Sequence, residues 1–370
     1  MKLLCFIDNL GSGGAQRQLV NLAILFKGGG HEVEFLVYDS NDFFLPLLEA
    51  HGIPVSRIGN GSYLQRIIGC RRHLRRSDCD VVIAFLDTPN FLACLSAIGR
   101  HKWRLITNEL SARKASFEDA MPRFLKLFQR FSDLLICNSV NAKSLWLGLS
   151  PWISDKIQVI YNPVLLGELE CELRADAGAR RRMVVVATYH EMKNPIVLVQ
   201  AVAALPEDEK NRLKVDWYGA TESVRGDTSV YDSTRKAAVE LGLDEVMTFH
   251  PATDRIYNVM QSADIIGLFS DYEGLPNAIC EAMTLGKPVI MTKVSDYQVL
   301  VDEGNGFLCA SADVHGLKSA IEAMLATSDD ELAAKGRESG RRAHELFDPE
   351  RIVAQWTAAF GSVVERDGRS

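Results

Sequence analysis

Residues 265–283, IIGLFSDYEGLPNAICEAM, contain a strand, a polar loop and a helix in succession. The opening run is apolar throughout instead of alternating, which is typical of a strand buried on both faces of a parallel sheet. Pro276 suits the first turn of a helix, and the helical pattern continues to Leu285. Glu273 is therefore expected in the loop at the positive end of the helix, with Glu281 in the second helical turn.

Short β-rich runs, most of them apolar throughout, recur on both sides of this stretch, and helical patterns separate them. The runs span residues 3–7, 33–37, 81–85, 105–107, 134–137, 157–160, 183–187, 215–218, 246–249 and 288–291. The helical patterns include residues 15–26, 195–205 and 350–364. Alternating strands and helices build doubly wound parallel sheets, so the predicted fold class is α/β.

The alternation is interrupted once, and the interruption divides the chain. Residues 162–182 are charged and aperiodic, whereas the strand–helix alternation starts afresh at Met183. A chain of 370 residues is long enough for two domains. We therefore expect Rossmann-like domains at residues 1–165 and 183–348, a linker at residues 166–182, and a C-terminal helix at residues 349–370 that packs back on the first domain.

The composition excludes several classes of protein. Hydrophobic residues make up 47% and charged residues 24%, a globular balance that excludes disorder and fibrous repeats. The net charge of −7 argues against a nucleic-acid partner, although residues 1–165 carry 19 Lys and Arg against 14 Asp and Glu.

The eight cysteines include no CxxC pair, so we expect buried thiols and no metal site. No signal peptide or membrane span is predicted, and we expect a cytoplasmic protein.

The two glutamates of residues 265–283 suit the recognition of a sugar. Carboxylates accept hydrogen bonds from hydroxyl groups, and the amides at a helix N-terminus stabilise negative charge. Ligands of open α/β sheets bind at the carboxyl edge of the strands, where Glu273 is placed. The alternative is an ordinary acidic start of a helix, since Asp and Glu favour first turns.

Two further loops follow predicted strands. The glycines of GSGGAQ, residues 11–16, allow backbone amides to approach an anion. An NAD fingerprint with Asp39 as the ribose ligand is the alternative, but it requires Gly or Ala where Gln16 stands. The second loop, YHEMKNP, places Lys193 at a helix N-terminus, which favours a phosphate bound between them. A solvated surface lysine is the alternative there.

Together these motifs resemble the retaining glycosyltransferases of family 4, which have the GT-B fold. Glu273 and Glu281 within EGLPNAICEAMTLGKPVI are similar to the E-x7-E signature of that family. GSGGAQRQLVNLA resembles its N-terminal glycine loop, ATYHEMKN its GRLxxxKN segment, and ELGLDEVMTFHPATDRIYNVMQSADI the stretch that leads to its base-binding loop. The match covers most of residues 180–330 and is looser over residues 1–165.

The resemblance implies two Rossmann-like domains that face a cleft, with the acceptor on the N-terminal domain and the nucleotide-sugar donor on the C-terminal one. It implies catalysis without a metal or cofactor, by Glu273 at the sugar and Lys193 at the diphosphate. Glu281 would hold the ribose, and residues 249–254, with Pro251 among them, would line the base pocket. The other implied donor contacts are Gly13, Gly14, Arg17, Thr188, His190, Gly274, Leu275, Pro276 and Asn277.

Two positions depart from the family pattern. Family members usually have Arg five residues before the lysine, where this chain has Thr188; His190 and Arg17 are candidates to supply the missing charge. Many members carry a His in the N-terminal cleft, whereas residues 106–110 read ITNEL and offer Glu109 as the acceptor-side candidate. A loop carboxylate without a ligand is the alternative for Glu109.

The implied enzyme is a hexosyl- or N-acetylhexosaminyltransferase that takes a sugar from a nucleotide-diphosphate donor, which we expect to be a UDP-sugar. The expected acceptor is a glycan or a lipid-linked glycan in the assembly of a bacterial-type surface polysaccharide or glycoconjugate. The family implies front-face attack with retention, the leaving phosphate assisting deprotonation. The alternatives are a sugar-nucleotide epimerase of the same fold and a catalytically silent sugar-nucleotide-binding protein.

Two basic stretches of the first half suggest contact with a membrane. Residues 121–131, MPRFLKLFQRF, mix Arg and Lys with Phe and Leu. The other stretch surrounds apolar residues with five arginines, namely Arg66, Arg71, Arg72, Arg75 and Arg76. Basic amphipathic helices lie on anionic membranes, so peripheral contact with the inner face of the cell membrane is a hypothesis. For each stretch alone, a core-facing helix with a solvated basic side is the alternative.

Overall fold

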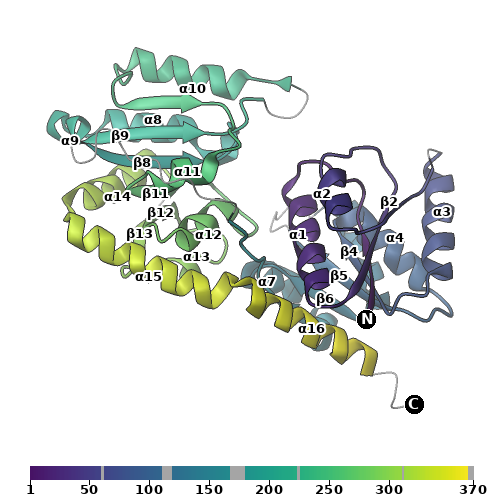
Figure 1. Ribbon diagram of the computed structural model, residues 1–370. Helices are drawn as coiled ribbons and strands as arrows, with labels where there is room; N and C mark the ends of the chain where they lie inside the picture. Colours follow the sequence, from purple (N-terminus) through teal and green to yellow (C-terminus); the bar gives the residue numbers. More distant parts are fainter. Residues whose placement is uncertain (60–61, 111–118, 167–179, 223–225, 311, 366–370) are drawn as a thin grey trace. The chain divides into compact units, whose positions relative to one another are not determined.

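The computed structural model describes residues 1–59, 62–110, 119–166, 180–222, 226–310 and 312–365 (Figure 1). The chain divides into two compact units, unit 1 with Met1–Leu165 and Asp348–Ser370, and unit 2 with Leu166–Phe347. Each unit is built on one parallel sheet with helices, which confirms the predicted α/β class. Residues 167–179 of the predicted linker lie outside the described residues.

Unit 1 contains a seven-stranded parallel sheet in the order β3-β2-β1-β4-β5-β6-β7. Its strands are β1 (Lys2–Phe6), β2 (Glu32–Val37), β3 (Val55–Arg57), β4 (Val81–Phe85), β5 (Arg104–Glu109), β6 (Leu134–Cys137) and β7 (Ile157–Val159). Its helices include α1 (Gly14–Gly28), α2 (Leu45–Ala50), α3 (Tyr63–Arg76), α4 (Asp87–Ala97), α6 (Ala120–Lys126), η1 (Leu127–Phe131), α7 (Val140–Leu149), η2 (Pro151–Lys156) and α16 (Pro349–Glu365). The strand order reverses between β1 and β4.

Unit 2 contains a six-stranded parallel sheet in the order β10-β9-β8-β11-β12-β13. Its strands are β8 (Arg181–Val186), β9 (Leu213–Tyr218), β10 (Met247–His250), β11 (Ile265–Leu268), β12 (Val289–Thr292) and β13 (Gly306–Cys309). Its helices include η3 (Glu191–Lys193), α8 (Pro195–Ala203), α9 (Glu207–Asn211), α10 (Ser229–Glu240), α11 (Ile256–Gln261), α12 (Asn277–Thr284), α13 (Tyr297–Leu300), α14 (Val314–Ala326) and α15 (Asp329–Phe347). Here the order reverses between β8 and β11.

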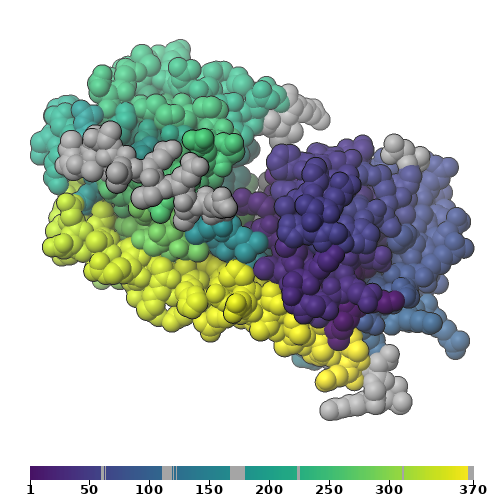
Figure 2. Space-filling view, in the orientation of Figure 1, coloured from purple at the N-terminus to yellow at the C-terminus, as the bar shows by residue number. Residues whose placement is uncertain are grey.

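The central strands are largely apolar because helices cover both faces of each sheet. Every residue of β4, β6, β11 and β12 is buried. The C-terminal helix α16 contributes to the core of unit 1, where Trp356 and Phe360 pack edge-on against Phe26 of α1 with ring centroids 5.7 and 5.2 Å apart. Figure 2 shows this yellow end of the chain against the purple N-terminal residues.

The cysteines are buried thiols in the part of the chain that the structure describes. Seven are free and buried, whereas Cys171 lies outside the described residues. Burial raises the pKa of Cys70 and Cys79 to about 11, so both stay uncharged at neutral pH. These side chains therefore behave as small apolar groups of the cores.

The ends of β8 and β9 approach each other so closely that Gly219 has no room for a side chain. A Cβ built there would lie 1.8 Å from the carbonyl oxygen of Ala187. That oxygen already accepts a hydrogen bond from Trp217 Nε1 at 2.7 Å, so it is not free to shift. The close approach brings the loop after β8 to its place at the carboxyl edge of the sheet.

We expect Gly219→Ala to lower the free energy of unfolding by about 1–3 kcal/mol, because the backbone must move to relieve the overlap. Urea-induced unfolding measures the change. Gly361→Ala on α16 is the matched control, since a Cβ there meets nothing within 4 Å and alanine favours a helix. Equal stability of the two variants would contradict this description of the β8–β9 edge.

Candidate active site

The point where the strand order of unit 2 reverses brings together two of the predicted loops. Lys193 lies in the loop after β8, and Glu273 lies in the loop after β11. The two strands are neighbours in the sheet, with Gly267 paired to Val185. Ligands of doubly wound sheets bind at this switch point, outside the carboxyl ends of the strands.

Lys193 and Glu273 are in direct contact. The Lys193 ammonium donates to Glu273 Oε1, and both side chains are mostly buried, 17% and 13% exposed. Ser270 Oγ donates to the same oxygen at 2.6 Å. No partner of Glu273 Oε2 is found among the described residues, so this oxygen is available to a hydroxyl group.

A set of short polar contacts fixes the two loops to each other. Asn194 has a left-handed backbone with φ 56°, and its Nδ2 donates to Phe269 O at 2.9 Å and to Asp271 Oδ1 at 2.6 Å. The Asp271 amide donates to Met192 O at 2.9 Å. Lys193 therefore cannot move far from Glu273 without breaking contacts on both sides.

The N-terminus of α12 offers donors for an anion at the same edge. Within the described residues, no acceptor is recorded for the backbone amides of Gly274, Leu275, Asn277 and Ala278. Such amides and the positive end of the helix dipole stabilise negative charge. Pro276 is the N-cap residue of α12 and directly precedes the first turn in which it was expected.

Glu281 lies on the second turn of α12, as the sequence predicts, and is 8% exposed. The Tyr257 hydroxyl donates to its Oε1 at 3.3 Å, so α11 and α12 meet at this carboxylate. The structure thus places Glu273 and Glu281 at the two ends of one short loop-to-helix segment.

The other predicted donor contacts of unit 2 occupy the loops around these residues. Thr188, His190 and Pro251 are exposed. His190 Nδ1 accepts from the Met192 amide at 3.2 Å, which gives the histidine a role in capping η3. Within the part of the chain that the structure describes, no hydrogen bond or ion pair joins Thr188 or Pro251 to Lys193 or Glu273.

A buried network supports the end of β10, next to the predicted base pocket. His250 Nε2 lies 3.1 Å from Asp216 Oδ1, and Arg182 Nε donates to Asp216 Oδ2 at 2.7 Å. The His250 ring stacks on Tyr218 with centroids 4.2 Å apart. Burial and the Asp216 carboxylate raise the pKa of Tyr218, so its hydroxyl stays protonated.

In unit 1, Gly13 and Gly14 lie at the N-terminus of α1, where Gly13 is the capping residue. Gln16 Nε2 donates to Asp8 Oδ1 at 3.0 Å, so the residue that departs from the NAD fingerprint holds the glycine loop against the end of β1. Arg17 is half-buried on the first turns of the same helix.

Glu109 is buried at the end of β5 in a charged cluster. Lys126 Nζ donates to Glu109 Oε2 at 2.6 Å, and Trp146 Nε1 donates to the same oxygen at 3.0 Å. Asp87 Oδ1 lies 3.5 Å from the Lys126 ammonium. Burial by itself lowers the pKa of Lys126, but the charges of Glu109 and Asp87 outweigh it and the net shift is upward.

Two amide oxygens beside this cluster have no partner among the described residues. Asn108 Oδ1 and Asn138 Oδ1, each on a residue that is 3% exposed, make no hydrogen bond with any described residue. Asn108 is next to Glu109 on β5, and Asn138 directly follows β6. Buried polar atoms normally have partners, so the carboxyl edge of this sheet has spare acceptors for a ligand.

No role was predicted for Ser270, Asn194 or Tyr257, and Lys126 was predicted only as one cation of the basic stretch at residues 121–131. Ser270 and Asn194 directly border predicted loop residues, and a polar residue immediately after an apolar strand is a signal that points to the carboxyl edge. Tyr257 and Lys126 sit in helical patterns, where no local feature shows which side chain turns inward.

Two family models match the chain. Glycosyltransferase Family 4 matches residues 12–167, and Glycosyl transferases group 1 matches residues 175–343. With the two doubly wound sheets and the paired glutamates after β11, these matches define a glycosyltransferase. The chain belongs to family 4, the retaining glycosyltransferases with the GT-B fold, which confirms the resemblance.

Curated relatives span the same length. The N-acetylgalactosamine-N,N'-diacetylbacillosaminyl-diphospho-undecaprenol 4-alpha-N-acetylgalactosaminyltransferase of Campylobacter jejuni is 23% identical over 95% of this chain and 97% of its own length. The lipopolysaccharide core biosynthesis glycosyltransferase LpsE of Rhizobium meliloti is 26% identical over 88% of this chain and 90% of its own length.

Solved structures share the fold. HepE of Anabaena in complex with UDP and glucose superposes with a TM-score of 0.82 at 20% identity, covering 98% of this chain and 100% of HepE. Sucrose-phosphate synthase of Thermosynechococcus elongatus superposes with a TM-score of 0.80 at 16% identity, covering 99% and 100%. These similarities confirm the predicted GT-B architecture.

Proposed function

We propose that this glycosyltransferase takes a hexose or an N-acetylhexosamine from a UDP-sugar bound by unit 2 and transfers it to a lipid-linked glycan. The observation that carries the donor site is the contact of Lys193 with Glu273, beside the amides at the start of α12. It combines a cation for a diphosphate, a carboxylate for sugar hydroxyls and further donors for phosphate oxygens at one edge of the sheet.

The chemistry follows from the charge that develops in the reaction. The bond between the anomeric carbon and the diphosphate oxygen breaks, and the acceptor oxygen bonds to that carbon on the same face. The acceptor hydroxyl proton passes to the departing diphosphate. Lys193 and the α12 amides stabilise the negative charge on the leaving group, while Glu273 Oε2 holds the sugar.

The remaining donor contacts stay predictions within this proposal. Glu281 would bind the ribose, and Pro251 with its neighbours would border the base. Gly274, Leu275, Pro276 and Asn277 would supply backbone contacts. Gly13, Gly14, Arg17, Thr188 and His190 would complete the surroundings of the diphosphate without a metal ion.

We place the acceptor on unit 1. The support is Glu109 at the carboxyl edge of β5, with the spare amide oxygens of Asn108 and Asn138 beside it. Hydroxyl groups of a glycan are donors that such oxygens accept. The undecaprenol in the name of the Campylobacter relative supports a polyprenyl-diphosphate carrier, and the UDP in the HepE complex supports a uridine donor.

A transfer assay tests the function. The protein is incubated with a panel of nucleotide sugars and a polyprenyl-diphosphate glycan, and the product is analysed by mass spectrometry and by NMR of the new linkage. We expect one added sugar with the anomeric configuration of the donor. Conversion of the donor to another nucleotide sugar without an acceptor would instead establish the epimerase alternative, and a donor that stays unchanged would establish a silent binding protein.

An exposed apolar row on α6 and η1 supports contact with the membrane that carries such an acceptor. The exposed side chains are Met121, Phe124, Leu127 and Phe131, with Arg123 and Arg130 between them. In α3, by contrast, Arg71 and Arg75 donate to the carbonyls of Leu95, Ser96 and Ile98 at the end of α4. No described helix is long and apolar enough to cross a bilayer. The proposed membrane surface is therefore α6 and η1.

We expect the protein to pellet with anionic vesicles at low salt and to lose this binding at high salt. Phe124→Ser combined with Leu127→Ser should weaken vesicle binding about tenfold or more, since each removes an apolar side chain from the interface. Phe43→Ser is the matched control, because Phe43 is 65% exposed elsewhere in unit 1. Equal binding by the double variant and the control would refute the assignment.

A further inference from the structure

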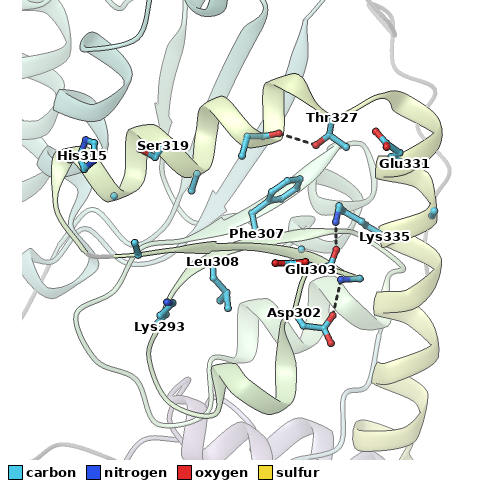
Figure 3. A pocket seen from close by; sticks show the side chains of 17 residues that line it. Lys293, Asp302, Glu303, Phe307, Leu308, His315, Ser319, Thr327, Glu331 and Lys335 are labelled. Carbon is cyan, nitrogen blue, oxygen red and sulfur yellow. Dashed lines mark hydrogen bonds between the residues drawn. The ribbon is translucent and has the colours of Figure 1, made fainter.

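A groove of about 960 Å³ runs beside β13, the last strand in the sheet order of unit 2 (Figure 3). Its walls come from α14, α15 and the segment after β12. The α14 wall carries small side chains, which leave room beside the strand: Gly316, Ser319, Ala320, Ala323 and Thr327. The open edge of a parallel sheet is thus accessible to an added strand.

The pairing of β13 with β12 shows which backbone groups of β13 remain unpaired. The Val289 amide donates to Asn305 O at 3.4 Å, so residues 305, 307 and 309 face β12. The alternate residues direct their groups outward, which leaves Gly306 C=O, both groups of Leu308, and Ala310 N–H at the edge. Neither the amide nor the carbonyl of Leu308 makes a hydrogen bond to a described residue beyond the β12–β13 pair.

This set of groups is symmetric about Leu308. In an antiparallel pair centred there, Leu308 exchanges two hydrogen bonds with Leu308 of a second copy, and each Ala310 amide meets a Gly306 carbonyl. The four bonds use the Gly306 carbonyl, both groups of Leu308 and the Ala310 amide of each copy, while the Gly306 amide donates to Asp302 O within its own chain at 3.0 Å. This register is compatible with a two-fold axis perpendicular to the sheet. Such an axis leaves corresponding faces of the two sheets on the same side of the combined sheet.

The charges along the groove also favour an antiparallel pair. Figure 3 shows Lys293 and His315 towards one end of β13, and Asp302, Glu303 and Lys335 towards the other. Asp302 is paired with Arg342 at 2.7 Å and the Lys335 ammonium donates to Glu303 O, so the carboxylate left for a partner at this end is that of Glu303. The side chains of Lys293, His315 and Glu303 are exposed and make no ion pair with a described residue. Antiparallel pairing brings the basic end of one copy to the acidic end of the other, which is favourable at both ends.

We propose that this chain forms a two-fold symmetric dimer in which β13 pairs with β13 of a second copy, so that the two six-stranded sheets continue into one. The interface lies on unit 2 and does not rest on the proposed donor or acceptor. Its specificity comes from the backbone groups around Leu308 and from the Lys293-to-Glu303 contacts across the axis.

Sedimentation velocity of the full-length protein over a concentration series tests the proposal. We expect a reversible dimer at low salt, weakened about tenfold or more by K293E or by E303K, since each reversal acts twice in a symmetric interface. The double variant K293E/E303K should dimerise again, because the exchanged charges pair once more. Both positions are exposed, so neither change threatens the fold.

Two controls make the result specific. A310P removes an outward amide without touching the ladder to β12 and should weaken the dimer, because proline is compatible with an edge position. K236E lies on an exposed part of α10 and should leave association unchanged. A monomer at every concentration overturns the proposal, and so does a dimer that withstands K293E and E303K alike.

Discussion

Replacing Lys193 with Ala is expected to lower kcat by about 10²–10³-fold, the loss typical of removing one stabilising group from a developing anion. In the structure the Lys193 ammonium contacts Glu273 and is 17% exposed, so the charge acts in a partly desolvated site. The loss should fall on kcat more than on the KM of the donor, because negative charge on the diphosphate grows as the sugar departs. Steady-state kinetics with the preferred nucleotide sugar measure both constants.

Three variants accompany Lys193→Ala. Lys193→Arg should restore part of the activity, since it keeps the charge at a different geometry. Glu273→Gln should also depress turnover, because it removes the carboxylate that Lys193 and Ser270 hold in place. Lys236→Ala, an exposed lysine paired with Glu240 on α10, is the matched control and should transfer normally. An unchanged transfer rate in a folded Lys193→Ala protein would contradict the assignment.

Replacing Lys126 with Met is expected to lower the free energy of unfolding by about 3–5 kcal/mol, the cost of leaving a buried charge without its partner. Lys126 is 5% exposed, and the Glu109 carboxylate that it contacts is equally buried. Loss of Lys126 costs little at Asp87, because the Asp87 side chain is 55% exposed and water can solvate its charge. Chemical denaturation measures the change.

A double variant separates the ion pair from simple packing. Lys126→Met combined with Glu109→Leu removes both charges, so most of the lost stability should return, although Trp146 Nε1 then lacks its acceptor. Glu109→Gln alone should impair transfer to the acceptor if this carboxylate binds the acceptor. A single Lys126→Met variant as stable as the unmodified protein would show that the pair is not buried as described.

Much of the fold could be predicted from local patterns. The apolar runs at residues 81–85, 134–137 and 265–269 contain β4, β6 and β11, because residues buried on both faces of a sheet are mostly apolar. Two strands were not predicted. β3 contains a single apolar residue in VSR. β13 has an apolar run of only three residues, FLC, after a glycine and a polar turn, which is shorter than the runs of the central strands.

The site could be predicted only in part, for a physical reason. Glu273, Glu281 and Lys193 are visible because each follows a strand or opens a helix, and the carboxyl edge gathers such positions. The contact between Lys193 and Glu273 joins residues 80 positions apart, and no sequence pattern near either residue predicts it. Likewise, Lys126 looks like one cation in a basic amphipathic stretch, but it turns inward to Glu109 while Arg123 and Arg130 of the same stretch stay exposed.

A crystal structure of the protein with UDP tests the donor site most directly. We predict that diphosphate oxygens lie within hydrogen-bonding distance of Lys193 Nζ and of the amides that open α12, with the ribose at Glu281. A nucleotide bound at full occupancy elsewhere, with the loops after β8 and β11 left empty, would contradict the proposal that these two loops hold the activated sugar.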